Sequence, residues 1–150
     1  MGRGEIEIFR KFIPKCPYPI QKGSIQKMSP PEPDILCKLE DGEEKYFELV
    51  ECVDAYLAES LSLKIPVGGF LPTDGQIWTE PLEKKFIKKY PKICELFAYY
   101  DRQPIIAENT WLLIMEDYIK NNLKRSQFKR VWIYSVPQER ILFTYPNLGV

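Results

Sequence analysis

The sequence contains no histidine. This absence excludes histidine metal sites, Ser-His-Asp and Cys-His nucleophile systems, and histidine general bases. Any chemistry must therefore depend on carboxylates, lysines, tyrosines or thiols.

Cysteine pairs and long apolar runs are also missing. The four cysteines stand far apart without a Cys-x-x-Cys spacing, which argues against a thiolate zinc site or a redox pair and predicts buried, reduced core residues. No apolar run approaches the roughly 18–20 residues of a membrane span, and Met1–Arg10 lacks a signal-peptide core. We therefore expect no membrane association and a cytoplasmic location. The cysteines are Cys16, Cys37, Cys52 and Cys94.

The composition is that of an ordinary globular protein. Hydrophobic residues make up 45% and charged residues 28% of the 150 residues, and 21 basic residues balance 21 acidic ones. Such a length predicts one domain, residues 1–150, that folds without disulfides or metal. Because the net charge is zero, only the distribution of charge can indicate a polyanionic partner.

Hydrophobic periodicity predicts an α/β protein with a mixed central sheet flanked by helices. Asp54 is the expected N-cap of a second helix, and Ile65–Trp78 is expected to be a long loop. Trp111–Met115 alone also fits a buried strand. The expected helices are Gly4–Ile13, Asp54–Leu63, Leu82–Tyr90 and Ala107–Lys124, and the expected strands are Ser24–Met28, Asp34–Leu39, Glu43–Cys52, Cys94–Asp101, Val131–Ser135 and Arg140–Tyr145.

A hairpin carries the main functional signal. If Glu40-Asp41-Gly42 is its loop, with Gly42 at positive φ, Leu39 faces Glu43 and Asp34 lies directly across from Glu48. Opposed residues of an antiparallel pair point to the same face, with Cβ atoms about 4.5–5.5 Å apart. Two carboxylates so placed repel each other unless a cation or a shared proton intervenes. The alternatives are a register slip of one residue, or a Glu48 that simply faces solvent.

A divalent metal is the simplest relief for this acid pair, and hard carboxylate oxygens suit Mg²⁺ or Mn²⁺. Alternation along the strand places Phe47 and Leu49 on one face and Tyr46, Glu48 and Val50 on the other. The strand is therefore mostly apolar and expected to be central, so an acid in its middle needs a reason.

Pro33-Asp34, followed after the hairpin by Glu48 in Tyr46-Phe47-Glu48-Leu49-Val50-Glu51, resembles the restriction-endonuclease-like, or PD-(D/E)xK, superfamily. The order of helices and strands around the hairpin is similar over most of the chain. The resemblance implies a single restriction-endonuclease-like domain in which Asp34 and Glu48 bind the metal.

The sequence departs from the superfamily pattern at its lysine, because Val50 stands two residues after the second acid. That lysine is expected to position the attacking water and to stabilise negative charge. Either another lysine takes its role, or Glu51 reshapes the catalytic site from the end of the strand, or the enzyme is inactive. The candidate lysines are Lys38, Lys64, Lys84 and Lys85.

Glu5 is a candidate additional acid. It falls near the centre of the apolar stripe of the first helix, whereas Glu7 falls opposite. Some members of the resembled superfamily place a first-helix acid near the metal. The alternative is that Glu5 complements the helix dipole.

Basic residues gather in two segments. No acid occurs from Ile119 to Gln138, and seven acids surround the hairpin. A second basic set lies on the segment Lys84–Lys92, where the outer face of the expected helix carries Lys84, Lys85, Lys88 and Lys89. Such patches suit a phosphodiester backbone, although lysine-rich helix faces are often solvated surface. The candidate nucleic-acid contacts are Lys84, Lys85, Lys88, Lys124 and Arg125. Tyr99, Tyr100, Trp111 and Trp132 either stack on bases or pack in the core.

Two functions follow from these observations. The first is a Mg²⁺-dependent or Mn²⁺-dependent nuclease with Asp34, Glu48 and Glu51 as catalytic residues. The alternative is a catalytically inactive nuclease-fold protein that acts as a binding or assembly module, favoured by Val50 and by aromatics expected to be exposed near Trp78 and Trp132. The apolar segment Ile65–Trp78 suggests a homo-oligomer.

Overall fold

The structure is a computed structural model that describes residues 2–52, 76–101 and 108–148. Its helices are α1 (Gly2–Phe12), α3 (Gln76–Phe86) and α4 (Glu108–Asn122). Short 3₁₀ turns are η1 (Ile13–Lys15), η2 (Lys22–Ser24) and η3 (Leu123–Arg125). The strands are β1 (Gln26–Lys27), β2 (Ile35–Lys38), β3 (Glu44–Glu51), β4 (Cys94–Tyr100), β5 (Phe128–Ser135) and β6 (Arg140–Tyr145).

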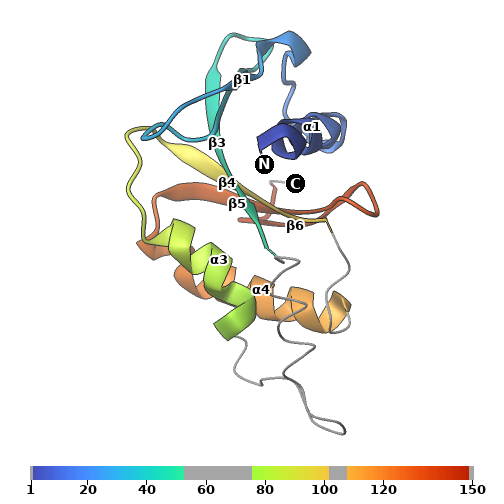
Figure 1. The fold of residues 1–150 in the computed structure, drawn as a ribbon, viewed down its shortest axis with the longest axis vertical. Helices are drawn as coiled ribbons and strands as arrows, with labels where there is room; N and C mark the ends of the chain where they lie inside the picture. The colour runs from blue at the N-terminus through green and yellow to red at the C-terminus, as the bar shows by residue number, and fades with distance from the viewer. Residues whose placement is uncertain (1, 53–75, 102–107, 149–150) are drawn as a thin grey trace, which may run out of the picture.

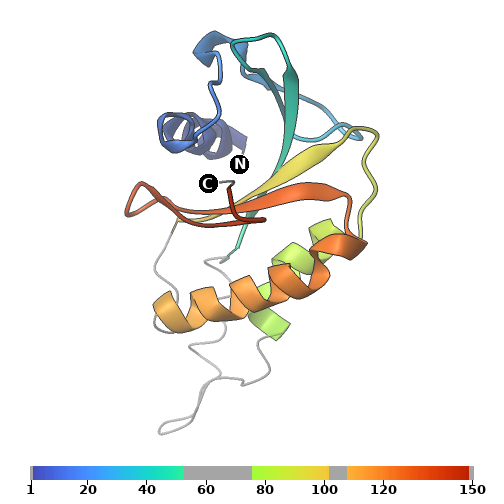
Figure 2. The ribbon, with the colours of Figure 1, turned by 180° about the vertical axis from the view of Figure 1, so that it is seen from behind.

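The six strands form one sheet in the order β1-β2-β3-β4-β5-β6. β3, β4 and β5 run parallel, while β1, β2 and β6 pair antiparallel with their neighbours. α1 covers one face of the sheet, and α3 and α4 cover the other (Figures 1 and 2). The predicted class, α/β with a mixed sheet flanked by helices, is confirmed. In the described ranges no helix is both long and apolar enough to cross a membrane.

Strand alternation divides the core into two layers. Phe47 and Leu49 of β3 pack on the α1 side, whereas Tyr46 and Val50 face α3 and α4. The first layer is rich in aromatic rings: that of Phe12 lies within 6.4 Å of five others, counted between ring centroids. Each layer also holds two of the four cysteines, all of which are buried and free, as expected.

The hairpin between β2 and β3 has the predicted register. Ile35 lies opposite Phe47, and the Leu39 N–H donates to the Glu43 carbonyl over 2.8 Å. Gly42 has φ +92°, the left-handed conformation in which glycine avoids the steric cost of a side chain. The next position along this register places Asp34 opposite Glu48.

Three predicted element boundaries are wrong. The strand expected over Ser24–Met28 is reduced to β1, because η2 occupies its start. α3 begins at Gln76 and contains Pro81, so the last residues of the expected loop Ile65–Trp78 are helical. The same helix ends at Phe86 and not at Tyr90.

The remaining elements agree with expectation. Trp111–Met115 is helical within α4, and β5 begins three residues before the predicted start at Val131. The helix predicted for Asp54–Leu63 and the loop residues before Gln76 lie outside the described residues, so the proposed oligomer contact there stays a prediction.

Candidate functional site

The two acids of the hairpin are bonded to each other's strands. Glu48 Oε1 accepts a hydrogen bond from the Asp34 backbone N–H over 3.1 Å, and Asp34 Oδ2 accepts one from the Leu49 N–H over 2.9 Å. These bonds fix both carboxyl groups where β2 begins. Asp34 keeps its other oxygen, Oδ1, outside them.

Glu48 lies in the middle of the third strand of the sheet and is only 3% exposed. Its burial raises the pKa of the carboxyl above the ordinary value of 4.5, the hydrogen bond from Lys85 opposes that change, and the neighbouring charge of Asp34 adds to it. A buried acid whose proton affinity is raised by burial and by a second acid is typical of functional sites.

Lys85 supplies the cation. Its Nζ lies 2.7 Å from Glu48 Oε2, a distance that makes a charge-assisted hydrogen bond. Lys85 is on the last turn of α3, which packs on the same face of the sheet as Glu48. The sequence had placed Lys85 on an outer helix face. The structure instead turns it inward, and of the three candidate lysines that it describes, Lys85 is the one that contacts Glu48.

Among the described residues, neither of the other two candidates contacts Glu48. Lys38 and Lys84 are exposed, and Lys64 lies outside the described residues. Glu51 is exposed and, three residues along β3 from Glu48, points toward the opposite face. The structure therefore does not bring Glu51 together with Glu48.

Tyr90 is a neighbour of this site that the sequence did not indicate. Its ring is buried, and its hydroxyl has no hydrogen-bond partner among the described residues. Burial raises the pKa of the phenol, and the charge of Glu48 raises it further. A tyrosine within a lysine-rich segment, just before a proline, was the available sequence signal.

Glu5 on α1 lies near Asp34, one member of the acid pair, and not near Glu48. Tyr99 on β4 donates a hydrogen bond from its hydroxyl to Glu5 Oε2 over 2.9 Å. Glu5 and Asp34 line one small hollow of about 20 Å³, together with Lys27 and Leu49. This volume holds about one water molecule. Glu7 is exposed, as its position on the helical wheel predicted.

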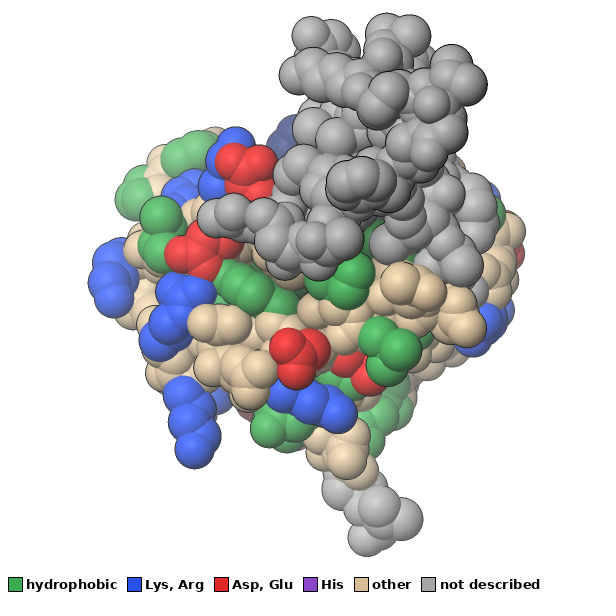
Figure 3. Space-filling model, turned by 90° about the horizontal axis from the view of Figure 1, so that it is seen from below, with side chains coloured by type: hydrophobic (Ala, Val, Ile, Leu, Met, Phe, Trp, Pro, Cys, Tyr) green, Lys and Arg blue, Asp and Glu red, His purple; other side chains and the backbone are tan. Residues whose placement is uncertain are grey.

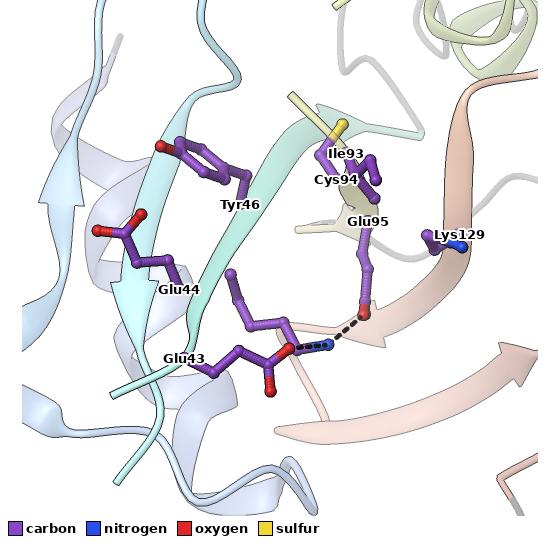
Figure 4. A pocket seen from close by; sticks show the side chains of 8 residues that line it. Glu43, Glu44, Tyr46, Ile93, Cys94, Glu95 and Lys129 are labelled. Atoms are coloured by element: carbon purple, nitrogen blue, oxygen red, sulfur yellow. Dashed lines mark ion pairs between the residues drawn. The ribbon is translucent and has the colours of Figure 1, made fainter. Parts of the chain in front are cut away.

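A larger hollow of about 390 Å³ lies where β3 and β4 begin (Figure 4). Lys45 crosses it, with Nζ 3.5 Å from Glu95 Oε2 and 4.0 Å from Glu43 Oε2. The buried Glu95 also accepts hydrogen bonds from Tyr18 and Trp132, over 2.8 and 2.7 Å. These contacts satisfy Glu95 and identify it as a structural acid that ties β4 to β5.

Most of the candidate nucleic-acid contacts lie at the surface. Lys84, Lys88 and Lys124 are exposed, whereas Arg125 is engaged by Glu83 and the Tyr118 hydroxyl. Tyr99, Tyr100, Trp111 and Trp132 are all buried, so of the two roles left open, core packing is confirmed. The expectation that Trp132 is exposed is wrong, because Trp132 on β5 is fully buried and packs against Phe12 of α1. The side chain of Trp78 lies outside the described part.

Among the described residues, no group of three or more Asp, Glu or Cys side chains is placed to hold a metal ion. Mg²⁺ keeps several waters and commonly binds through one or two carboxylates, so its binding by Asp34 and Glu48 stays a proposal. Comparisons with family models, with curated proteins and with solved structures found no match.

Proposed function

We propose that this chain is a metal-dependent nuclease of the restriction-endonuclease-like class that hydrolyses phosphodiester bonds, with Asp34, Glu48 and Lys85 at its site. One observation carries the proposal: Lys85 Nζ lies 2.7 Å from Glu48 Oε2, beside the strand position that Asp34 opposes. In this proposal Lys85 on α3 takes the role of the superfamily lysine, whose position on β3 is occupied by Val50.

The roles follow from the chemistry of the three side chains. Asp34 and Glu48 are the ligands of Mg²⁺ or Mn²⁺, which when bound stabilises charge on a phosphoryl oxygen and lowers the pKa of water. Lys85 donates a hydrogen bond to negative charge that develops on the phosphate. The Leu49 N–H holds the Asp34 carboxylate in place through Oδ2.

One observation favours the second candidate, a non-catalytic binding module of the same fold. Glu48 is 3% exposed, and both of its oxygens are bonded within the protein. A buried, satisfied ion pair can serve structure alone. In that case the acid pair and Lys85 join α3 to the sheet and have no turnover.

The test measures cleavage of single-stranded DNA, duplex DNA and RNA with Mg²⁺ or Mn²⁺, by the wild type, Asp34→Asn and Lys85→Met. We expect each variant to lose about 10²-fold or more of the rate, the typical effect of removing a group that stabilises transition-state charge. Lys15→Met is the matched control, since Lys15 on η1 is exposed, lies outside both basic segments, and its loss changes the net charge equally.

Equal rates in Lys15→Met and Lys85→Met would contradict the assigned role of Lys85. Thermal unfolding of each variant separates lost chemistry from lost structure. No cleavage by the wild type, with metal affinity equal in wild type and Asp34→Asn, would favour the binding module.

A further inference from the structure

Two connecting segments meet at the end of the sheet where β4 and β5 begin. One segment joins α3 to β4, and the other runs from η3 to β5. Because β4 and β5 are parallel and Cys94 lies opposite Phe128, both segments end at the same edge. The Tyr90 N–H donates to the Gln127 side chain, and the Tyr90 ring lies 5.5 Å from that of Phe128. The two basic segments of the sequence are thus one surface.

This surface, which we call the basic margin, carries five exposed lysines. No acidic residue occurs in the sequence between Lys84 and Cys94, or between Ile119 and Gln138. Lys and Arg side chains project along the left margin of the face in Figure 3. The basic margin consists of Lys88, Lys89, Lys92, Lys124 and Lys129.

Lys129 of the basic margin lines the hollow of Figure 4 with Glu43 and Glu44, and the other four lysines do not. Within the described part of the chain, no ion pair includes any of the five lysines. The neighbouring cations are different: Arg125 pairs with Glu83, and Lys45 pairs with Glu43 and Glu95. A cluster of like charges repels itself and attracts a polyanion.

The basic margin reaches the face of β3 that carries Glu48, because Lys92 Nζ lies 5.8 Å from the centre of the Tyr46 ring. Lys85, which contacts Glu48, belongs to the same acid-free stretch as Lys88, Lys89 and Lys92. On its other side the margin ends at the hollow of Figure 4, whose rim carries Glu43 and Glu44. The lysines between Lys85 and these acids would therefore attract an anionic chain, and Glu43 and Glu44 would repel it.

We infer that the basic margin binds phosphates of a nucleic-acid strand, namely the phosphates that flank the one reacting at Glu48 and Lys85. This inference rests on the proposed function. It assigns the binding of flanking phosphates to two connectors that lie far apart in the sequence. The exposed side chains of Ile87 and Ile93, 60% and 69% exposed, lie in the first connector and offer apolar contact to sugars or bases.

The experiment measures binding without cleavage, in EDTA, so that failure of the chemistry does not affect it. Fluorescence anisotropy gives the affinity of the full chain for labelled oligothymidylate, oligouridylate and duplex DNA across a salt series. Lys89→Ala/Lys124→Ala removes one lysine from each connector. Lys15→Ala/Lys22→Ala, two exposed lysines of η1 and η2, is the matched control.

We expect the double variant of the basic margin to reduce the slope of log affinity against log salt by about 1.4–1.8, since each phosphate contact contributes about 0.7–0.9. The control should keep the wild-type slope. Equal slopes in both double variants, or no binding of any probe at low salt, would overturn the inference. So would tighter binding to anionic lipid vesicles than to every oligonucleotide.

The two proposals can fail separately. A wild type that binds with the expected slope loss but never cleaves contradicts the proposed function alone. A wild type that cleaves, while both double variants bind as it does, contradicts only the assignment of the basic margin.

Discussion

At the scale of the residue, Glu48 combines burial with an acidic and a basic neighbour. Its proton affinity reflects burial first, then the opposing Lys85, then Asp34. A side chain in such surroundings responds to pH in a way that an exposed carboxylate does not.

This response predicts a pH dependence of stability. Because the pKa of Glu48 is raised in the folded state, the folded protein holds that proton more tightly than the unfolded chain. Its contribution to the free energy of unfolding is therefore present below the ordinary pKa of 4.5 and is lost as the pH rises through the folded-state pKa. Glu48→Gln cannot titrate, so its stability should fall less than that of the wild type over this window.

Denaturant unfolding between pH 4 and pH 8 gives the free energy of unfolding of the wild type and of Glu48→Gln at each pH. The ionic strength should be low, about 10 mM, so that salt screens the charges little. Glu80→Gln, which replaces an exposed acid on α3, is the control and should run parallel to the wild type. A parallel curve for Glu48→Gln would contradict the raised pKa.

At the scale of the element, the β2–β3 hairpin determines the acid pair. Gly42 and Gly23 make a matched comparison, because a Cβ added to either meets nothing within 4 Å. Only Gly42 has positive φ. Gly42→Ala should therefore cost about 1–2 kcal/mol of unfolding free energy, the cost of a left-handed conformation for an L-residue.

Gly23→Ala should stay within about 0.5 kcal/mol of the wild type, as most exposed substitutions do. Chemical denaturation measures both variants. The same loss at the two positions would mean that the turn conformation of Gly42 is not what limits the substitution.

The elements also show what the sequence could predict. The hairpin register was predictable because a glycine-ended loop fixes which residues oppose each other. The start of α3 was not, since Pro81 favours a first-turn position and here lies inside the helix. The sequence analysis also assigned Lys85 to an outer face, although Lys85 lies three residues after the buried Leu82 and therefore on the same side of the helix.

The candidate site was likewise predictable only in its local part. Asp34 and Glu48 follow from local register, whereas Lys85 and Tyr90 reach Glu48 only through the packing of α3 and its connector on the sheet. The pairing of Arg125 with Glu83 joins two helices and had no local signal either. Contacts between distant segments depend on tertiary packing, which periodicity does not report.

At the scale of the whole molecule, the sheet separates two packed layers that share the strands β3, β4 and β5. Cys16 and Cys37 lie in the α1 layer, and Cys52 and Cys94 lie in the other. Burial raises the pKa of Cys16 to about 11 and that of Cys37 and Cys94 to about 12, and it also raises the pKa of Cys52.

We therefore expect all four thiols to resist a disulfide reagent at pH 8 in the native protein, because the thiolate is the reactive form. With increasing denaturant the four should become reactive in one transition, since the shared sheet couples the layers. Mass spectrometry of the labelled protein counts the modified thiols. A population with only two labelled cysteines, from one layer, would show that the layers open separately.

The contact of α1 with the sheet has a consequence for how the chain acquires its structure. Phe12 packs against Trp132 and Tyr134, which follow it only after most of the chain has been synthesised. The apolar stripe of α1 therefore stays exposed to solvent until β4 and β5 have paired. Contacts between such distant positions form slowly, so the docking of α1 should be a late event in folding.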